Sequence, residues 1–89
     1  MAFEYDPDKS AINKAKHGLD FEEAKALWDD PWLLEVPANT IDEPRFLGIG
    51  RIDGKHWTAI WTLRNGNLRI ISVRRSRKEE VGYYESERI

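Results

Sequence analysis

Arginine side chains are concentrated in one part of this sequence, and they are well suited to chemistry on a phosphate. Residues 45–78 carry nine basic side chains and one acidic side chain, Asp53. Arginine presents a planar fork that pairs with two phosphate oxygens and also stacks on nucleobases. The cluster therefore predicts a groove lined by cations, made of Arg45, Arg51, Arg64, Arg69, Arg74, Arg75, Arg77 and Lys78.

The first half of the chain has the opposite charge. Residues 1–44 contain eleven acidic and four basic side chains, so the net charge of −2 conceals a strong asymmetry. A basic segment of this density favours a polyanion or an acidic protein as partner. The alternative is a solvated sheet face whose arginines form ion pairs with the acidic helices.

Histidines and aromatic residues could assist chemistry at such a groove. Lys16 and His17 stand at the end of an expected helix, where either could transfer a proton, although the helix dipole alone favours a cation there. His56 lies in an apolar segment, and we interpret it as a half-buried surface histidine. The candidate stacking groups are His56, Trp57, Tyr83 and Tyr84.

We expect neither a metal site nor a cofactor. The sequence has no cysteine, which excludes a disulfide scaffold, a thiolate zinc site and a cysteine nucleophile. The acidic pairs Glu22-Glu23 and Asp29-Asp30 have no further ligand at a suitable spacing, and helix capping explains both. Gly48-Ile49-Gly50 lies inside a predicted strand, so it indicates close packing or a bulge rather than a phosphate loop.

The elements that must position these residues change from helical to extended near residue 31. Asp6-Pro7 predicts the start of a helix that ends at Gly18, and residues 20–23 resemble the capping box of a second helix, which ends before Pro31. A capping box at residues 76–79 predicts a last helix that ends near Glu87. Between the helices, a period of two predicts strands at residues 32–36, 45–52, 56–63 and 68–73.

The predicted order is α-α-β-β-β-β-α, in the α+β class, with residues 1–89 as a single domain. Asp53-Gly54 and Asn65-Gly66 are hairpin signals, so the sheet is expected to be an antiparallel four-stranded meander packed with helices. Its core should contain Trp28, Trp57, Trp61 and Ile70.

No segment of the sequence predicts export or a membrane span. No apolar stretch approaches the ~18–20 residues of a membrane helix, and the acidic start differs from a signal peptide. The absence of cysteine fits a reducing compartment, so we expect a cytoplasmic protein.

Short segments along nearly the whole chain, in order, resemble the BrnT family of toxins from bacterial type II toxin–antitoxin systems. Thr62-x-Arg64 and Arg69-Ile70-Ile71-Ser72-x-Arg74 are the most recognisable, and Glu80 and Tyr84 stand where the last helix of the family carries them. Modest departures occur at Val73 and Ser76-Arg77, and they spare the matched arginines. The earlier matching segments are Phe3-Glu4-Tyr5-Asp6-Pro7, Lys16-His17-Gly18, Phe21-Glu22-Glu23-Ala24, Asp29-Asp30-Pro31, Arg45-Phe46 and Ile49-Gly50.

The resemblance implies a RelE-like fold and a metal-independent endoribonuclease toxin that arrests growth by cutting RNA and blocking translation. It also implies a cognate antitoxin with a ribbon-helix-helix DNA-binding domain. The two proteins would together repress their own promoter, with operator DNA contacted only through the antitoxin and no membrane partner.

The resemblance also suggests roles for individual residues. Arg64, Arg69 and Arg74 would contact the phosphate, Lys16 or His17 would transfer a proton, and Tyr84 would support them. The Arg74→Ala variant is then expected to lose activity without unfolding. Further contacts to RNA would come from Arg45, Arg51, Arg75, Arg77 and Lys78.

Two other classes of function use the same basic residues. A non-catalytic RNA- or DNA-binding module would show a steep salt dependence of affinity and no cleavage. A protein-interaction domain would bind an acidic partner chain and would have negligible affinity for RNA.

Overall fold

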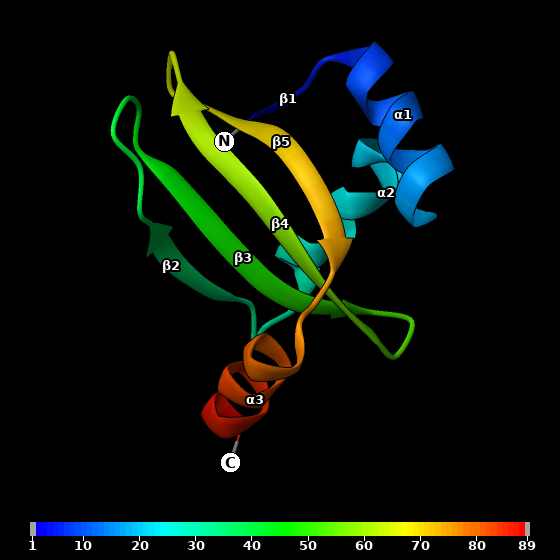
Figure 1. The fold of residues 1–89 in the computed structure, drawn as a ribbon, viewed down its shortest axis with the longest axis vertical. Coiled ribbons are helices and arrows are strands. Elements are labelled where there is room, and N and C mark those ends of the chain that lie inside the picture. The colour runs from blue at the N-terminus through cyan, green and yellow to red at the C-terminus, as the bar shows by residue number, and fades with distance from the viewer. Residues whose placement is uncertain (1, 89) are drawn as a thin grey trace.

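A mixed five-stranded sheet is the frame that positions the basic side chains. The computed structural model describes residues 2–88, and the strand order is β1-β5-β4-β3-β2 (Figure 1). The strands are β1 (Phe3–Glu4), β2 (Leu34–Ala38), β3 (Arg45–Ile52), β4 (Lys55–Arg64) and β5 (Asn67–Arg75).

Strands β2 to β5 form the predicted antiparallel meander, but β1 adds to it in parallel with β5. The expectation of a purely antiparallel four-stranded sheet is therefore wrong. The N–H of Leu68 donates to the carbonyl of Ala2 at 2.9 Å, which helps to hold this short strand at the edge. Two residues are too few to show the alternating pattern by which a strand is recognised in a sequence.

The first two predicted helices form where expected. Helix α1 (Pro7–His17) begins at Asp6, whose carboxylate accepts the Asp8 N–H at 2.9 Å, and ends at Gly18 with a φ of 90°. The predicted capping box between Asp20 and Glu23 opens α2 (Phe21–Ala24). The second helix then continues as the 3-10 helix η1 (Lys25–Asp29).

The last helix, α3 (Lys78–Glu87), is capped by different residues from those predicted. The Glu80 carboxylate, not Glu79, accepts the Arg77 N–H, at 2.7 Å. The Ser76 hydroxyl is instead 2.8 Å from the Thr58 hydroxyl, because it is used to join the end of β5 to β4. The sequence spacing fits both possible capping boxes. The contact between the Ser76 hydroxyl and the sheet selects the one formed by Arg77 and Glu80.

Strand β2 also differs from the predicted range of residues 32–36, because it begins at Leu34 and extends through Pro37 to Ala38. Pro37 pairs with Phe46 in the antiparallel register with β3. Strand β2 lies at the edge of the sheet, where the missing N–H of proline leaves no neighbouring strand unpaired. At the two hairpin turns, Asp53-Gly54 and Asn65-Gly66 all have positive φ, as a type I′ turn requires.

One face of the sheet carries the hydrophobic core under α2 and η1, whereas α1 lies alongside β5. Trp57, Trp61 and Ile70 are buried there as predicted, and Trp28 packs edge-on to Trp61. Close packing also explains Gly50, because a Cβ at this position would lie 3.0 Å from the Leu27 Cδ2 atom.

Helix α3 packs on the opposite face, which we call the α3 face. Thr58 and Thr62, four residues apart on β4, lie on it and are paired with Arg74 and Arg69 of β5. In a regular strand, two residues five positions apart would point to opposite faces. A β-bulge leaves Ile71 without a partner between Ser72 and Ile70, and this extra residue places both arginines on the α3 face.

Candidate functional site

Three of the predicted arginines lie together at the end of the α3 face beside the Asn65-Gly66 turn. We call this group, Arg45, Arg64 and Arg69, the turn end. The Glu43 carboxylate is 3.8 Å from Arg45 and 3.4 Å from Arg64, and Glu4 is 3.2 Å from Arg69. These side chains are partly exposed, so the ion pairs are weak and a phosphate can replace the carboxylates.

A second group, the helix end, lies where α3 packs against the same face. It consists of Arg51, His56 and Arg74, and the register pairs Arg51 with His56 across β3 and β4. The His56 Nε2 atom is 2.7 Å from the Glu85 Oε2 atom of α3. The hydrogen bond from His56 is the largest cause that lowers the pKa of Glu85. A histidine oriented by a carboxylate is a common arrangement for proton transfer.

The two ends are too far apart to act on a single phosphate. Arg69 and Arg74 are five residues apart on β5, which corresponds to about 15 Å along a strand. The predicted set of Arg64, Arg69 and Arg74 is therefore divided between the two ends. Such spacing suits contacts with different phosphates of one extended strand.

Arg74 is tied to the fold by the Glu80 carboxylate. Its two guanidinium nitrogens donate at 2.7 and 2.9 Å, and the Thr58 hydroxyl adds a third hydrogen bond at 3.0 Å. The Arg74 side chain is 20% exposed and that of Glu80 only 9%. The hydrogen bond from Arg74 outweighs the effect of burial and lowers the pKa of Glu80 to about 2. Arg74 thus joins α3 to the sheet, a role that sequence analysis did not assign to it.

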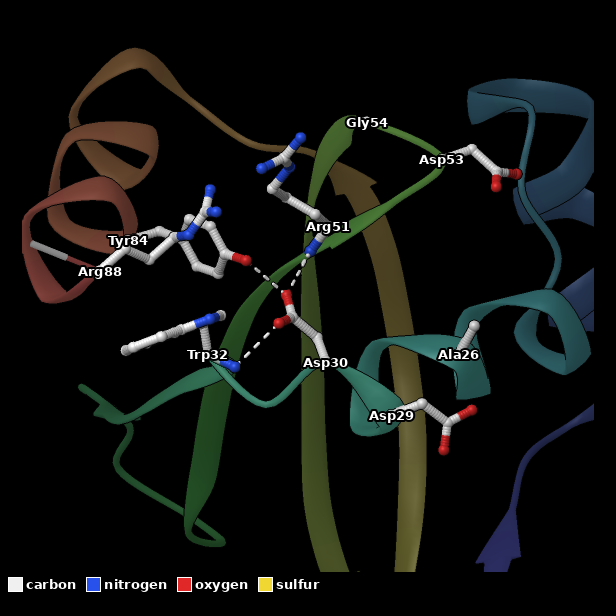
Figure 2. A pocket seen from close by; sticks show the side chains of 9 residues that line it. All are labelled: Ala26, Asp29, Asp30, Trp32, Arg51, Asp53, Gly54, Tyr84 and Arg88. Carbon is white, nitrogen blue, oxygen red and sulfur yellow. Dashed lines mark hydrogen bonds between the residues drawn. The ribbon is translucent and has the colours of Figure 1, made fainter.

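Tyr84 is also part of a structural network rather than a free group (Figure 2). Its hydroxyl donates to Asp30 at 2.6 Å, and the backbone N–H groups of Arg51 and Trp32 donate to the same carboxylate at 2.9 and 2.8 Å. Burial and the bond to Asp30 raise the pKa of Tyr84 to about 12. Burial acts to raise the pKa of Asp30, but these hydrogen bonds outweigh it and the pKa is lowered.

Lys16 and His17 lie at the same end of the sheet as Arg74. The Asn13 side chain donates to the Val73 carbonyl at 2.8 Å and accepts the Val73 N–H at 3.3 Å, so α1 runs beside β5. Helix α1 and strand β5 run in the same general direction (Figure 1). The last turn of α1 therefore brings Lys16 and His17 toward the end of β5.

The remaining basic residues are exposed around the helix end. Arg75 donates to the His56 carbonyl at 3.3 Å, and its guanidinium lies 5.4 Å from the Trp57 ring centroid. Arg77 and Lys78 are exposed at the start of α3. Of the aromatic residues expected to stack on bases, Trp57 and Tyr84 are buried and therefore unavailable, whereas Tyr83 is exposed.

Sequence analysis assigned no organising role to three carboxylates of this region, namely Asp30, Glu80 and Glu85. Asp30 and Glu85 are 54 and 29 residues away from the side chains that they hold, Tyr84 and His56. No local spacing could indicate these pairs. Glu80 is six residues from Arg74 and could have been suspected.

Two classes of site are not found in the part of the chain that the structure describes. Among residues 2–88, no three or more histidine, aspartate or glutamate side chains are grouped so that they could hold a metal ion. None of the helices described is both long and apolar enough to cross a membrane.

Comparison with known families identifies the chain. Residues 5–80 match the family described as the ribonuclease toxin BrnT of type II toxin–antitoxin systems. No curated protein matches the sequence. The matched region includes α1, strands β2 to β5 and the Arg74–Glu80 pair, and it ends before Tyr84 and Glu85. The chain therefore belongs to the BrnT family of ribonuclease toxins of type II toxin–antitoxin systems.

Proposed function

We propose that this chain is an endoribonuclease that cleaves RNA without a metal ion and so blocks translation. The observation that carries the proposal is the hydrogen-bonded pair of His56 and Glu85, which lies beside Arg51 and on the same face as Arg74. This arrangement belongs to a member of a ribonuclease toxin family. A RelE-like fold and a cytoplasmic site of action are part of the proposal, since the target is cellular RNA.

RNA supplies its own nucleophile for this reaction. The ribose 2′-oxygen loses its proton and attacks the adjacent phosphorus, the bond to the 5′-oxygen breaks, and that oxygen takes up a proton. The products carry a 2′,3′-cyclic phosphate and a 5′-hydroxyl. Arg51 and Arg74 would stabilise the charge that develops on the phosphate, and His56 would transfer a proton, held in position by Glu85.

The other predicted residues take supporting roles in this proposal. Arg45, Arg64 and Arg69 of the turn end would hold the RNA strand away from the cleavage point, while Arg75, Arg77 and Lys78 would add positive charge around it. Lys16 and His17 stay as alternative proton-transfer groups, because the last turn of α1 lies toward the same end of β5 as Arg74. Tyr84 would act indirectly, by fixing α3 against Asp30.

An antitoxin is the partner that a type II toxin implies. We further propose that this antitoxin carries a ribbon-helix-helix domain, neutralises the toxin and, with it, represses their shared promoter. Co-expression should restore growth, and promoter DNA should bind the complex but not the toxin alone. Binding of promoter DNA by the isolated toxin would contradict this part of the proposal.

The decisive experiment is cleavage of a labelled RNA oligonucleotide by the purified chain in the presence of EDTA. We expect internal cuts that leave 2′,3′-cyclic phosphate ends. A matched oligonucleotide with a single 2′-deoxy ribose at the main cut should resist cleavage there, because the nucleophile is missing.

Two results would overturn the proposal. Loss of activity in EDTA with recovery on adding a divalent metal would contradict metal independence. Salt-dependent RNA binding without cleavage, by a folded chain that also fails to arrest bacterial growth, would instead support the non-catalytic binding module.

A further inference from the structure

A cleft of about 350 Å³ opens between α3 and the turn that joins β3 to β4. Its lining includes Trp32, Arg51, Tyr84 and Arg88, which come from the turn before β2, from β3 and from the last turns of α3 (Figure 2). Arg88, like all residues after 80, lies outside the region matched by the family. The family comparison therefore assigns no role to this side of the cleft.

The floor of the cleft is held by hydrogen bonds. Asp30 accepts the Tyr84 hydroxyl and the backbone N–H groups of Trp32 and Arg51. Tyr84 itself is 1% exposed, so its side chain supports the cleft but offers almost no surface to a ligand. These bonds fix the relative positions of η1, β3 and α3 before any ligand arrives, which reduces the entropy lost on binding.

The rim of the cleft carries groups that are suited to a nucleotide. The Trp32 side chain is unusual in this chain because 47% of its surface is exposed, whereas Trp57 and Trp61 are buried. No carboxylate of residues 2–88 forms an ion pair with the Arg51 guanidinium. An exposed indole can stack on a base, and guanidinium groups beside it can bind the phosphate of the same nucleotide.

Arg88 is the second cation at this rim. Its guanidinium lies 5.7 Å from the Tyr84 ring centroid and 3.4 Å from a Glu85 oxygen, on a partly exposed side chain. Figure 2 shows the Arg51 and Arg88 side chains around Tyr84. The carboxylates of Asp29 and Asp53 lie at the other side of the cleft and point away from them. A phosphate is therefore favoured only on the side of the two arginines.

We propose that this cleft binds one nucleotide of the RNA, with its phosphate at Arg51 and Arg88 and its base against Trp32. The inference rests on the proposed ribonuclease function and locates part of its substrate. Arg51 is paired with His56 across two strands, and Glu85 contacts both His56 and Arg88. The bound nucleotide would thus lie next to the phosphate that is cleaved, and Arg51 would stand between the two phosphates.

The test uses the full chain and an RNA oligonucleotide whose 2′-hydroxyls are all methylated, so that it binds but cannot be cut. We expect the Trp32→Ala and Arg88→Ala variants each to weaken binding about tenfold. With cleavable RNA, KM should rise by a similar factor. Matched controls on α1 are Ile12→Ala, which removes another exposed apolar side chain, and Lys9→Ala, which removes another exposed charge.

The outcomes separate this inference from the proposed function. If wild type cleaves RNA but both variants bind and cleave like the controls, the inference is overturned and the ribonuclease proposal stands. If both variants keep RNA affinity but lose affinity for a neutralising antitoxin, the cleft is a protein-binding site and the inference again fails. If the folded wild type neither binds nor cuts RNA, both proposals are wrong.

Discussion

The two ends of the α3 face carry similar charges but hold them differently. At the turn end, Arg64 and Arg69 form single, partly exposed ion pairs with Glu43 and Glu4. At the helix end, Arg74 donates twice to the buried Glu80, and His56 is held by Glu85. Loosely held cations can adapt to an RNA strand, whereas groups that stabilise a transition state act best when they are already in place.

The largest difference between the two ends is expected in the chemical step. His56→Gln should lower kcat by roughly 100-fold or more, because a positioned proton-transfer group typically contributes 10²–10⁴-fold. The measurement is single-turnover cleavage at saturating enzyme. His17→Gln is the matched comparison, and loss of cleavage in that variant instead of His56→Gln would move proton transfer from the sheet to α1.

The next difference concerns stability. Arg74→Ala should lower the free energy of unfolding by about 3 kcal/mol, because it leaves the Glu80 carboxylate buried without its cation. Arg69→Ala, at the turn end, should lower it by about 1 kcal/mol or less. Urea unfolding monitored by tryptophan fluorescence measures both values. Equal urea midpoints for the two variants would show that Arg74 contributes no more to stability than Arg69. The sequence alone, which gives both residues as exposed cations, suggests that result.

Acid unfolding sharpens the same comparison. The pKa of Glu80 is lowered from 4.5 to about 2, so its ion pair stabilises the fold above pH 4.5 and the stabilisation is lost as the pH falls toward 2. A shift of this size corresponds to roughly 3 kcal/mol. Glu80→Gln should flatten the dependence of unfolding free energy on pH between 5 and 2.

The smallest expected effect is on affinity. The double variant Arg64→Ala/Arg69→Ala should weaken binding of uncleavable RNA about tenfold and leave kcat at saturating RNA close to that of wild type. If each arginine contacts one phosphate, the slope of log affinity against log salt should decrease by roughly 1.4. A large loss of kcat with unchanged affinity would place the chemistry at the turn end instead.

Local patterns in the sequence predicted most elements of this fold. Asp6-Pro7, Gly18 and the Asn65-Gly66 turn each determine their structure within a few residues. The short strand β1 was missed because its structure depends on β5, more than sixty residues later.

The candidate site was less predictable than the fold. The arginines were visible as a cluster, but their division into two ends depends on strand register. The pairing of His56 with Glu85 depends on how α3 packs against the sheet. For Arg74, the sequence indicates only a cation, and the buried Glu80 gives it a structural role as well.

The unpaired Ile71 has a consequence for comparing related chains. Without this residue, Arg69 and Arg74 would be four positions apart, and a regular strand would still place both of them on the α3 face. Two relatives that differ in length by one residue here could therefore present the same arginines to RNA, one through a bulge and the other through a regular strand. In an alignment of such relatives, a single gap between these two arginines would mark the absence of the bulge, not a change in the surface that α3 covers.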